Sequence, residues 1–113
     1  MSSHSQEPGF AVRAESILSG VERAIDGVAD DLDIDVLRTG NVITLGFENG
    51  HRIVVNSQEA AQEIWLAARS GGFHYRFDDA TQAWIDTRSG EDLRVVLARL
   101  IELEVGVSPA LAL

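Results

Sequence analysis

NVITLGFENGHRIVVN, at residues 41–56, contains two apolar runs that flank the triplet Glu48-Asn49-Gly50. Asn-Gly between two such runs is a strong signal for a β-hairpin, because both residues tolerate positive φ angles. The sequence therefore predicts one strand at 41–47, a second strand at 51–56 and a tight turn between them.

Four further segments on either side of this hairpin are predicted to be strands. Residues 33–38, DIDVLR, alternate at first, with the apolar Ile34 and Val36 on the side opposite the two aspartates. The other segments are residues 63–68 (EIWLAA), 73–77 (FHYRF) and 83–87 (AWIDT), with turns at Gly71-Gly72 and Asp78-Asp79. Consecutive strands joined by short loops predict a largely antiparallel sheet of five to six strands.

Apolar residues recur at helical spacing at both ends of the chain. The first set is Phe10, Ala14, Ile17, Leu18, Val21, Ile25 and Val28, which predicts a helix over 10–28. Near the end, Ser89-Gly90-Glu91-Asp92 has the form of a capping box. The apolar positions that follow it are Leu93, Val96, Leu97, Leu100 and Ile101, and Gly106 and Pro109 end this second helix. Two such helices on one face of the sheet make an α+β fold, a two-layer α-β sandwich.

Length and composition indicate one domain. The chain has 113 residues, of which 45% are hydrophobic, enough for a core. We expect residues 10–113 to form a single domain, and residues 1–9 to be a flexible lead-in because they lack the apolar segment of a signal peptide. No apolar run approaches ~18 residues, so no membrane span is predicted. The lack of cysteine excludes a disulfide scaffold and a thiolate metal site, and it agrees with a cytoplasmic location.

The net charge of −9 restricts the classes of partner. Phosphates would be repelled, so nucleic acid is an unfavourable partner, whereas cations and basic proteins are favoured. The sequence contains no HExxH, no GxSxG, no phosphate loop and no dinucleotide fingerprint. It therefore offers no candidate catalytic residue.

Negative charge is concentrated near the start of the chain, where residues 1–36 hold eight acids and two arginines, a net charge of −6. We use the name acidic ridge for seven of these acids: Glu15, Glu22, Asp26, Asp30, Asp31, Asp33 and Asp35. At roughly 100° per residue the first three lie within about 40° of one another, about 120° from the apolar stripe. The other four follow at once and are expected to extend this flank of the helix onto the first strand.

The residues alone leave two interpretations of the ridge open. One is a solvated helix face, and the other is a site for a hard cation such as Fe, Mn, Mg or Ca, which carboxylate oxygens suit. Arg23 is the only basic residue between Glu15 and Asp35, so the usual stabilising i,i+4 ion pairs are missing. An EF-hand loop is excluded, because Val36 and Val42 stand where it requires Gly and Glu. A metal site here would be open, weak and poorly selective.

A second candidate surface is the face of the sheet turned away from the helices. Its predicted members are Arg52, Asn56, Glu63, Trp65, His74 and Arg76. Trp65 is a large aromatic residue on a polar face, which fits either a side chain half-buried among the arginine arms or an anchor for a partner protein. The three histidines, His4, His51 and His74, have no metal-ligand spacing.

The chain resembles the frataxin family, and its bacterial members in particular, from about Phe10 to Leu100. The resemblance is carried by the acidic first helix and by DIDV (33–36), ITLGFENG (43–50), IVVNSQEA (53–60), EIWLAA (63–68), GGFHY (71–75) and WIDTRSGE (84–91). The run from Phe47 to Tyr75, with Asn-x-Gln-Glu before Ile-Trp-Leu and then Gly-Gly-aromatic-His, is highly specific.

The resemblance implies weak binding of iron, Fe²⁺ or Fe³⁺, through the acidic ridge, with other divalent hard cations as further ligands. It implies a role in iron–sulfur cluster assembly as an iron chaperone, sensor or regulator. The implied partners are a cysteine desulfurase and the cluster scaffold protein, and the metal-free protein is expected to be a monomer. The implied partner-binding positions on the sheet are Asn56, Gln58, Trp65 and His74.

The sequence departs from the family pattern at several positions. Ala60 replaces the usual Pro after Gln-Glu, and Glu63 replaces the usual Gln before Ile-Trp, which adds an acid to the implied partner face. An alternative function is a protein-interaction module that docks on the desulfurase through its acids and binds metal only incidentally. A ferroxidase has little support, because no carboxylate–histidine cluster of the di-iron kind is present.

Overall fold

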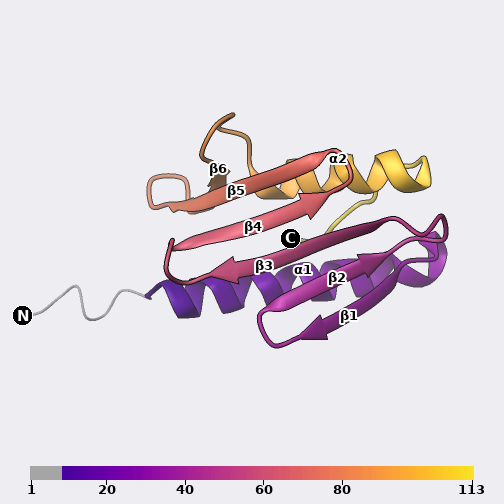
Figure 1. Ribbon diagram of the computed structural model, residues 1–113, viewed down its shortest axis with the longest axis horizontal. Coiled ribbons are helices and arrows are strands. Elements are labelled where there is room, and N and C mark those ends of the chain that lie inside the picture. Colours follow the sequence, from indigo (N-terminus) through magenta and orange to yellow (C-terminus); the bar gives the residue numbers. More distant parts are fainter. Residues whose placement is uncertain (1–8) are drawn as a thin grey trace, which may run out of the picture.

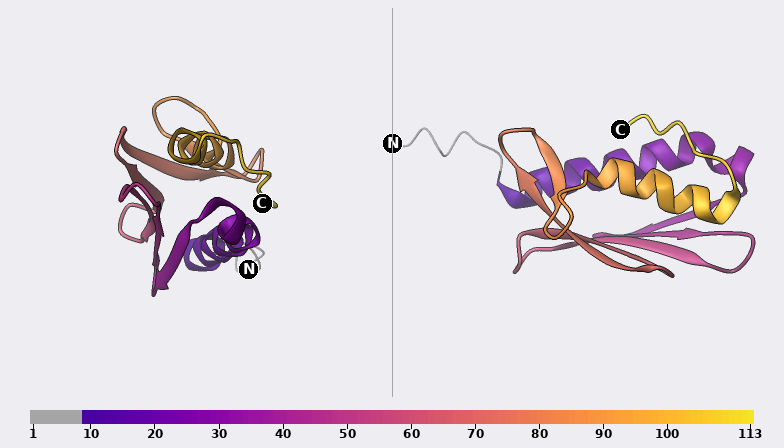
Figure 2. Two further views of the ribbon diagram at one scale, coloured as in Figure 1. Left: turned by 90° about the vertical axis from the view of Figure 1, so that its right-hand side faces the viewer. Right: turned by 90° about the horizontal axis from the view of Figure 1, so that it is seen from above.

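The computed structural model describes residues 9–113, in which two helices cover one face of a six-stranded sheet (Figure 1, Figure 2). The elements are α1 (Phe10–Leu32), β1 (Asp35–Thr39), β2 (Val42–Gly46), β3 (Arg52–Gln58), β4 (Glu63–Ala68), β5 (Gly71–Asp78), β6 (Ala83–Asp86) and α2 (Leu93–Val105). The strands lie side by side in chain order, and each neighbouring pair is antiparallel. The predicted two-layer α-β sandwich is confirmed.

The predicted flexible lead-in at residues 1–9 falls outside the described residues, except for Gly9, which caps α1. Neither described helix combines the length and the apolar character needed to cross a bilayer.

The hairpin predicted from Asn49-Gly50 joins β2 and β3. The two strands pair in antiparallel register, with Leu45 opposite Ile53. Gly50 has a φ angle of 88°, which favours glycine, and its N–H donates to the Phe47 carbonyl at 2.9 Å. Gly50 thus has the conformational role that the sequence assigned to it, whereas Asn49 keeps a negative φ angle.

The core lies between the inner face of the sheet and the two helices. Alternate residues in the middle of β2, β3 and β4 are buried there, and both helices contribute a stripe at helical spacing. The residues with no exposed surface include Val21, Ile25, Ile43, Leu45, Ile53, Val55, Ile64, Tyr75, Leu93, Val96, Leu97 and Ile101. Each fully buried Leu or Ile contributes about 1.5–3 kcal/mol relative to its exposed state.

Helix α1 is longer than the sequence predicts and ends at Leu32 rather than at Val28. Ala29 and Leu32 pack against the core, so the apolar stripe continues for one more turn despite Gly27. Asp33 ends the helix in the left-handed conformation, with φ 54° and ψ 50°, which Asp tolerates better than most residues. The first strand therefore begins at Asp35, two residues later than predicted.

The predicted N-cap of α2 is wrong, because Asp92 caps the helix instead of Ser89. The Asp92 side chain accepts a hydrogen bond from the Arg94 backbone N–H at 2.8 Å. The Glu91 carbonyl accepts from the Asp86 N–H, and Asp92 forms a bridge to Ile85. Because these contacts hold residues 91–92 extended beside β6, the helix begins only at Leu93.

Tyr75 places a polar atom in the core. Its side chain is fully buried, and its hydroxyl has no hydrogen-bond partner among residues 9–113. Burial, followed by the nearby negative charge of Asp86, raises the pKa of the Tyr75 hydroxyl, which therefore stays protonated and neutral. The ring contributes packing, whereas the hydroxyl has lost its contacts with water.

We expect the free energy of unfolding of Tyr75→Phe to equal that of the parent protein or to exceed it by up to about 1 kcal/mol, because the substitution removes an unsatisfied hydroxyl. Tyr75→Ala is the matched control and should cost about 3–5 kcal/mol through the cavity that it leaves. Urea unfolding of the three proteins measures both changes. A loss above about 1 kcal/mol in Tyr75→Phe would show that the hydroxyl is satisfied.

Candidate metal-binding and partner-binding surfaces

The carboxylates of α1 form a row along one flank of the helix. Its polar members are Glu15, Ser19, Glu22, Asp26, Asp30 and the C-cap Asp33, each three or four residues from the next. At about 100° per residue the five members within α1 fall within roughly 80° of one another, and Asp33 follows at the end of the helix. The buried residues of α1 lie on a different side, so the row leaves the core undisturbed.

Two predicted members of the acidic ridge point elsewhere. Because α1 continues through Leu32, Asp31 lies about 100° around the helix axis from Asp30. Asp35 is the first residue of β1, in which the side chains of Val36 and Arg38 face the helix layer. Successive strand residues alternate, so Asp35 belongs to the opposite face of the sheet. Five of the seven ridge acids therefore lie along this flank of α1 or at its end.

The row is open to solvent and does not form a cage. Glu15, Asp26, Asp30 and Asp33 are exposed, and Glu22 is partly buried. Within residues 9–113 no three acidic or histidine side chains come together closely enough to enclose a metal ion. The oxygens suit hard cations, but a cation here would keep much of its water.

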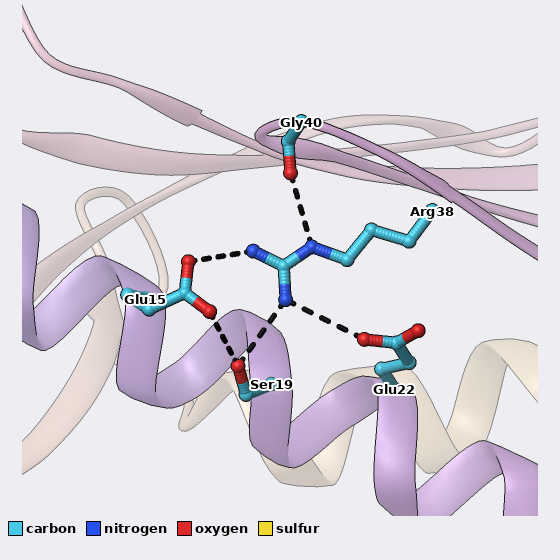
Figure 3. A network of polar contacts seen from close by, with 5 residues as sticks. All are labelled: Glu15, Ser19, Glu22, Arg38 and Gly40. Carbon is cyan, nitrogen blue, oxygen red and sulfur yellow. Dashed lines mark hydrogen bonds and ion pairs between the residues drawn. The ribbon is translucent and has the colours of Figure 1, made fainter.

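Arg38 of β1 lies against the first half of this row (Figure 3). Its Nη2 donates to Glu15 Oε1 at 2.7 Å, and its Nη1 donates to Ser19 Oγ at 3.2 Å and lies 3.5 Å from Glu22 Oε1. Its Nε donates to the Gly40 carbonyl at 3.0 Å. The side chain is only 17% exposed, so these contacts fix the guanidinium beside the helix.

Arg38 is a residue that the sequence analysis missed. Arg23 is the only basic residue between Glu15 and Asp35, whereas Arg38 comes from the adjacent strand. The available signal was the alternation in β1: Arg38 shares its side of the strand with Val36, which packs on the core. A charged residue on the inner side of an edge strand points toward the helix layer.

Charge is distributed unevenly along the row. The hydrogen bond from Arg38, and then that from Ser19, lowers the pKa of Glu15. By contrast, Asp26, Asp30 and Asp33 form no ion pair with any residue in the described range 9–113. The last turn of α1 has no basic residue, although acids at a helix C-terminus are unfavourable. The second half of the row therefore carries uncompensated negative charge.

The second surface is the outer face of β3, β4 and β5. Asn56 is paired with Trp65, and Trp65 with His74, so the three side chains lie in one line across the strands. The Trp65 and His74 rings are stacked, with centroids 4.4 Å apart and planes 8° from parallel. Gln58 is on the same face, two residues beyond Asn56. The structure thus brings all four predicted partner-binding residues together.

Glu63 holds this surface in one arrangement. It is only 8% exposed, and its Oε1 accepts from the Trp65 indole Nε1 at 2.8 Å. Its Oε2 accepts from Arg76 Nε at 3.0 Å, and His74 Nδ1 lies 3.6 Å from Oε1. These bonds, that from Trp65 first, lower the pKa of Glu63, which stays ionised at neutral pH. The expected extra acid on the partner face is therefore neutralised within that face.

Neither of the two histidines within residues 9–113 takes part in the row of acids. His51 lies 2.8 Å from Glu104, where the β2–β3 turn meets α2, and His74 belongs to the outer sheet face. His4 is outside the described residues.

Comparisons with known proteins agree with this architecture. The sequence-family model of the frataxin-like domain matches residues 3–107. An iron-sulfur cluster assembly protein CyaY from Burkholderia mallei (strain SAVP1) is 48% identical over 99 residues, which cover 87% of this chain and 90% of the relative. The protein of the same name from Ralstonia nicotianae is 45% identical over 107 residues, with 93% of each chain covered.

A solved structure of the frataxin from Psychromonas ingrahamii superposes with a TM-score of 0.80 at 28% identity, covering 88% of this chain and 91% of that one. Trimeric yeast frataxin complexed with ferrous superposes at 0.74 and 24% identity, covering 84% and 87%, and shows the shared fold. The match of the family model to almost the whole chain, together with relatives at 45–48% identity, leads to one conclusion. The chain belongs to the frataxin-like family.

Proposed function

We propose that this protein binds iron and serves iron–sulfur cluster assembly. It binds Fe²⁺ or Fe³⁺ weakly on the row of carboxylates along α1, and acts as iron donor, sensor or regulator for a cysteine desulfurase and its scaffold protein in the cytoplasm. The observation that carries this proposal is the set of uncompensated acids at the end of α1, Asp26, Asp30 and Asp33, in a member of this family.

The chemistry of the row supports iron as cargo. Carboxylate oxygens are hard ligands that suit both oxidation states, and no thiolate is present to favour soft metals. The negative end of the α1 dipole adds to the attraction of a cation. Because the acids line one side of a helix and do not surround a point, affinity and selectivity are low.

The same acids provide a docking surface for a basic partner. An exposed row of negative charge attracts a positive patch on another protein and accelerates the encounter. A cation and a basic protein would compete for the same carboxylates. Iron binding would then regulate docking on the desulfurase.

The outer sheet face supports a second contact within the same assembly. Trp65 stacked on His74 presents a flat, partly exposed aromatic surface, and Asn56 and Gln58 supply amide groups beside it. Aromatic residues of this kind are common energetic centres of interfaces. We propose this face as the contact for the scaffold protein.

A protein-interaction module with incidental metal binding is the second candidate function. The absence of an enclosed cluster of three ligands among residues 9–113 favours it. In that case the acids serve docking alone, and iron leaves the activity of the desulfurase unchanged.

Anaerobic titration of ¹⁵N-labelled protein with Fe²⁺ tests the metal site. We expect NMR broadening centred on the end of α1, and loss of this broadening in the triple variant Asp26→Asn, Asp30→Asn, Asp33→Asn. That variant should be at least as stable as the parent, because neutralisation relieves repulsion worth a few tenths of a kcal/mol per close pair (about 0.2–0.5). Glu102→Gln, an exposed acid of α2, is the control. Broadening centred elsewhere would refute the site.

A cluster-assembly assay with a desulfurase and a scaffold separates the two candidate functions. We expect the protein to change the assembly rate by an amount that depends on the iron level, and Asp26→Lys with Asp30→Lys to weaken desulfurase binding at least about tenfold through charge reversal. Trp65→Ala should leave iron binding unchanged. An effect on the rate that is the same at every iron level would favour the interaction module.

Acidification should release Trp65 from Glu63. The folded-state pKa of Glu63 is below its ordinary value of 4.5, so its bonds are fully present above that value and are lost as the pH falls through the folded-state pKa. We expect the Trp65 indole ¹H–¹⁵N resonance to move below about pH 4.5. In Glu63→Gln this movement should vanish, with Trp84 as the internal control. An unmoved Trp65 resonance in the parent protein at low pH would contradict the assignment.

A further inference from the structure

We propose that Arg38 is a built-in counter-ion that withholds Glu15 and Glu22 from metal and confines iron to the second half of the row, at Asp26, Asp30 and Asp33. This inference rests on the proposed function, because it specifies where on α1 the cargo binds. Arg38 thereby becomes a residue that determines the position and number of bound ions.

The first support is the way in which the guanidinium is held. Each of its three nitrogens has a partner: Nε donates to the Gly40 carbonyl, Nη2 to Glu15, and Nη1 to Ser19, with Glu22 also in contact (Figure 3). At 17% exposure the side chain has little freedom to swing into solvent. An arginine keeps its charge at every pH at which the protein is folded, so this counter-ion cannot be removed by deprotonation.

The second support is the occupation of Glu15. Its Oε1 accepts from Arg38 at 2.7 Å and its Oε2 accepts from Ser19 at 2.5 Å. A cation that bound either oxygen would lie within a few ångströms of the fixed guanidinium and would be repelled by it. Metal binding at Glu15 is therefore disfavoured while Arg38 keeps its contacts with α1 and with the Gly40 carbonyl.

The third support is the contrast between the two halves of the row. Glu15, Glu22 and Arg38 together carry a charge of −1, because two acids are balanced by one base. Asp26, Asp30 and Asp33 carry −3 and have no ion-pair partner in the part of the chain that the structure describes. A divalent or trivalent cation is drawn to the half where no fixed positive charge competes.

The alternative role for Arg38 is that of a brace between β1 and α1 with no effect on metal. The two roles differ in what happens when Arg38 is removed. A brace alone would change stability only, whereas a counter-ion would free two carboxylates that are already three or four residues from Ser19 and in line with the rest of the row.

Calorimetric titration with Fe²⁺ under anaerobic conditions tests the counter-ion role. We expect Arg38→Gln to bind at least one more equivalent of iron than the parent protein, or to bind iron about tenfold more tightly, which corresponds to about 1.4 kcal/mol. Arg52→Gln is the matched control, because it removes the same charge from an exposed arginine of the outer sheet face, away from α1, and should produce at most a small, general increase. Thermal unfolding of each variant confirms that it is folded.

The acids behind Arg38 supply the decisive comparison. The triple variant Arg38→Gln, Glu15→Gln, Glu22→Gln removes the arginine together with both carboxylates that it contacts, and it should bind iron as the parent protein does. The gain in Arg38→Gln would then be due to these two carboxylates. The inference is overturned if Arg38→Gln gains no more than Arg52→Gln, or if the triple variant keeps the gain.

Two further variants of this protein distinguish a failure of the inference from a failure of the proposed function. Asp26→Asn with Asp30→Asn should lose most iron binding, and if it binds as the parent does, the proposed metal site itself fails. If that variant loses binding while Arg38→Gln gains nothing, only the role of Arg38 fails. If Arg38→Gln does not fold, the double variant Glu15→Gln, Glu22→Gln, which keeps Arg38, tests the inference in its place. A loss of iron binding in this variant as large as that in the aspartate variant would contradict the inference.

Discussion

Burial of one face of the sheet beneath two helices is the constraint on which the other features depend. Alternate residues of β2, β3 and β4 point into the core, and both helices meet them with a single apolar stripe. Apart from the Tyr75 hydroxyl, the polar side chains of the strands and helices described above therefore lie on the outer sheet face or on the exposed flanks of the helices. The two candidate surfaces of this protein, the outer sheet face and the flank of α1, are surfaces that remain exposed after this burial.

These two surfaces treat charge in opposite ways. On the outer sheet face, Glu63 is nearly buried and is fully engaged by Trp65 and Arg76, so a charge there organises an aromatic surface. Along α1, the negative charge is balanced at Glu15 and is left uncompensated from Asp26 onward. Unbalanced acids at the negative end of a helix dipole do not help the fold, which is why a role in binding explains them better.

The sequence predicted well whatever depends on local periodicity, such as the hairpin at Asn49-Gly50, the antiparallel sheet and the two amphipathic helices. It failed where a contact between distant segments decides the outcome. Residues 91–92 remain extended because they pair with β6, so the cap of α2 moved to Asp92. Arg38 reaches Glu15 across 23 positions, and spacing rules within one helix cannot show such a pair.

Under the proposed function, the openness of the row of acids has a consequence for the timing of iron transfer. A site that does not surround its ion loads almost as fast as the ion arrives and releases it by the same unobstructed path. A site of micromolar affinity loaded at about 10⁸ M⁻¹s⁻¹ empties about a hundred times each second. Such short residence suits a carrier that must hand its cargo on, whereas an enclosed cage of ligands would suit storage.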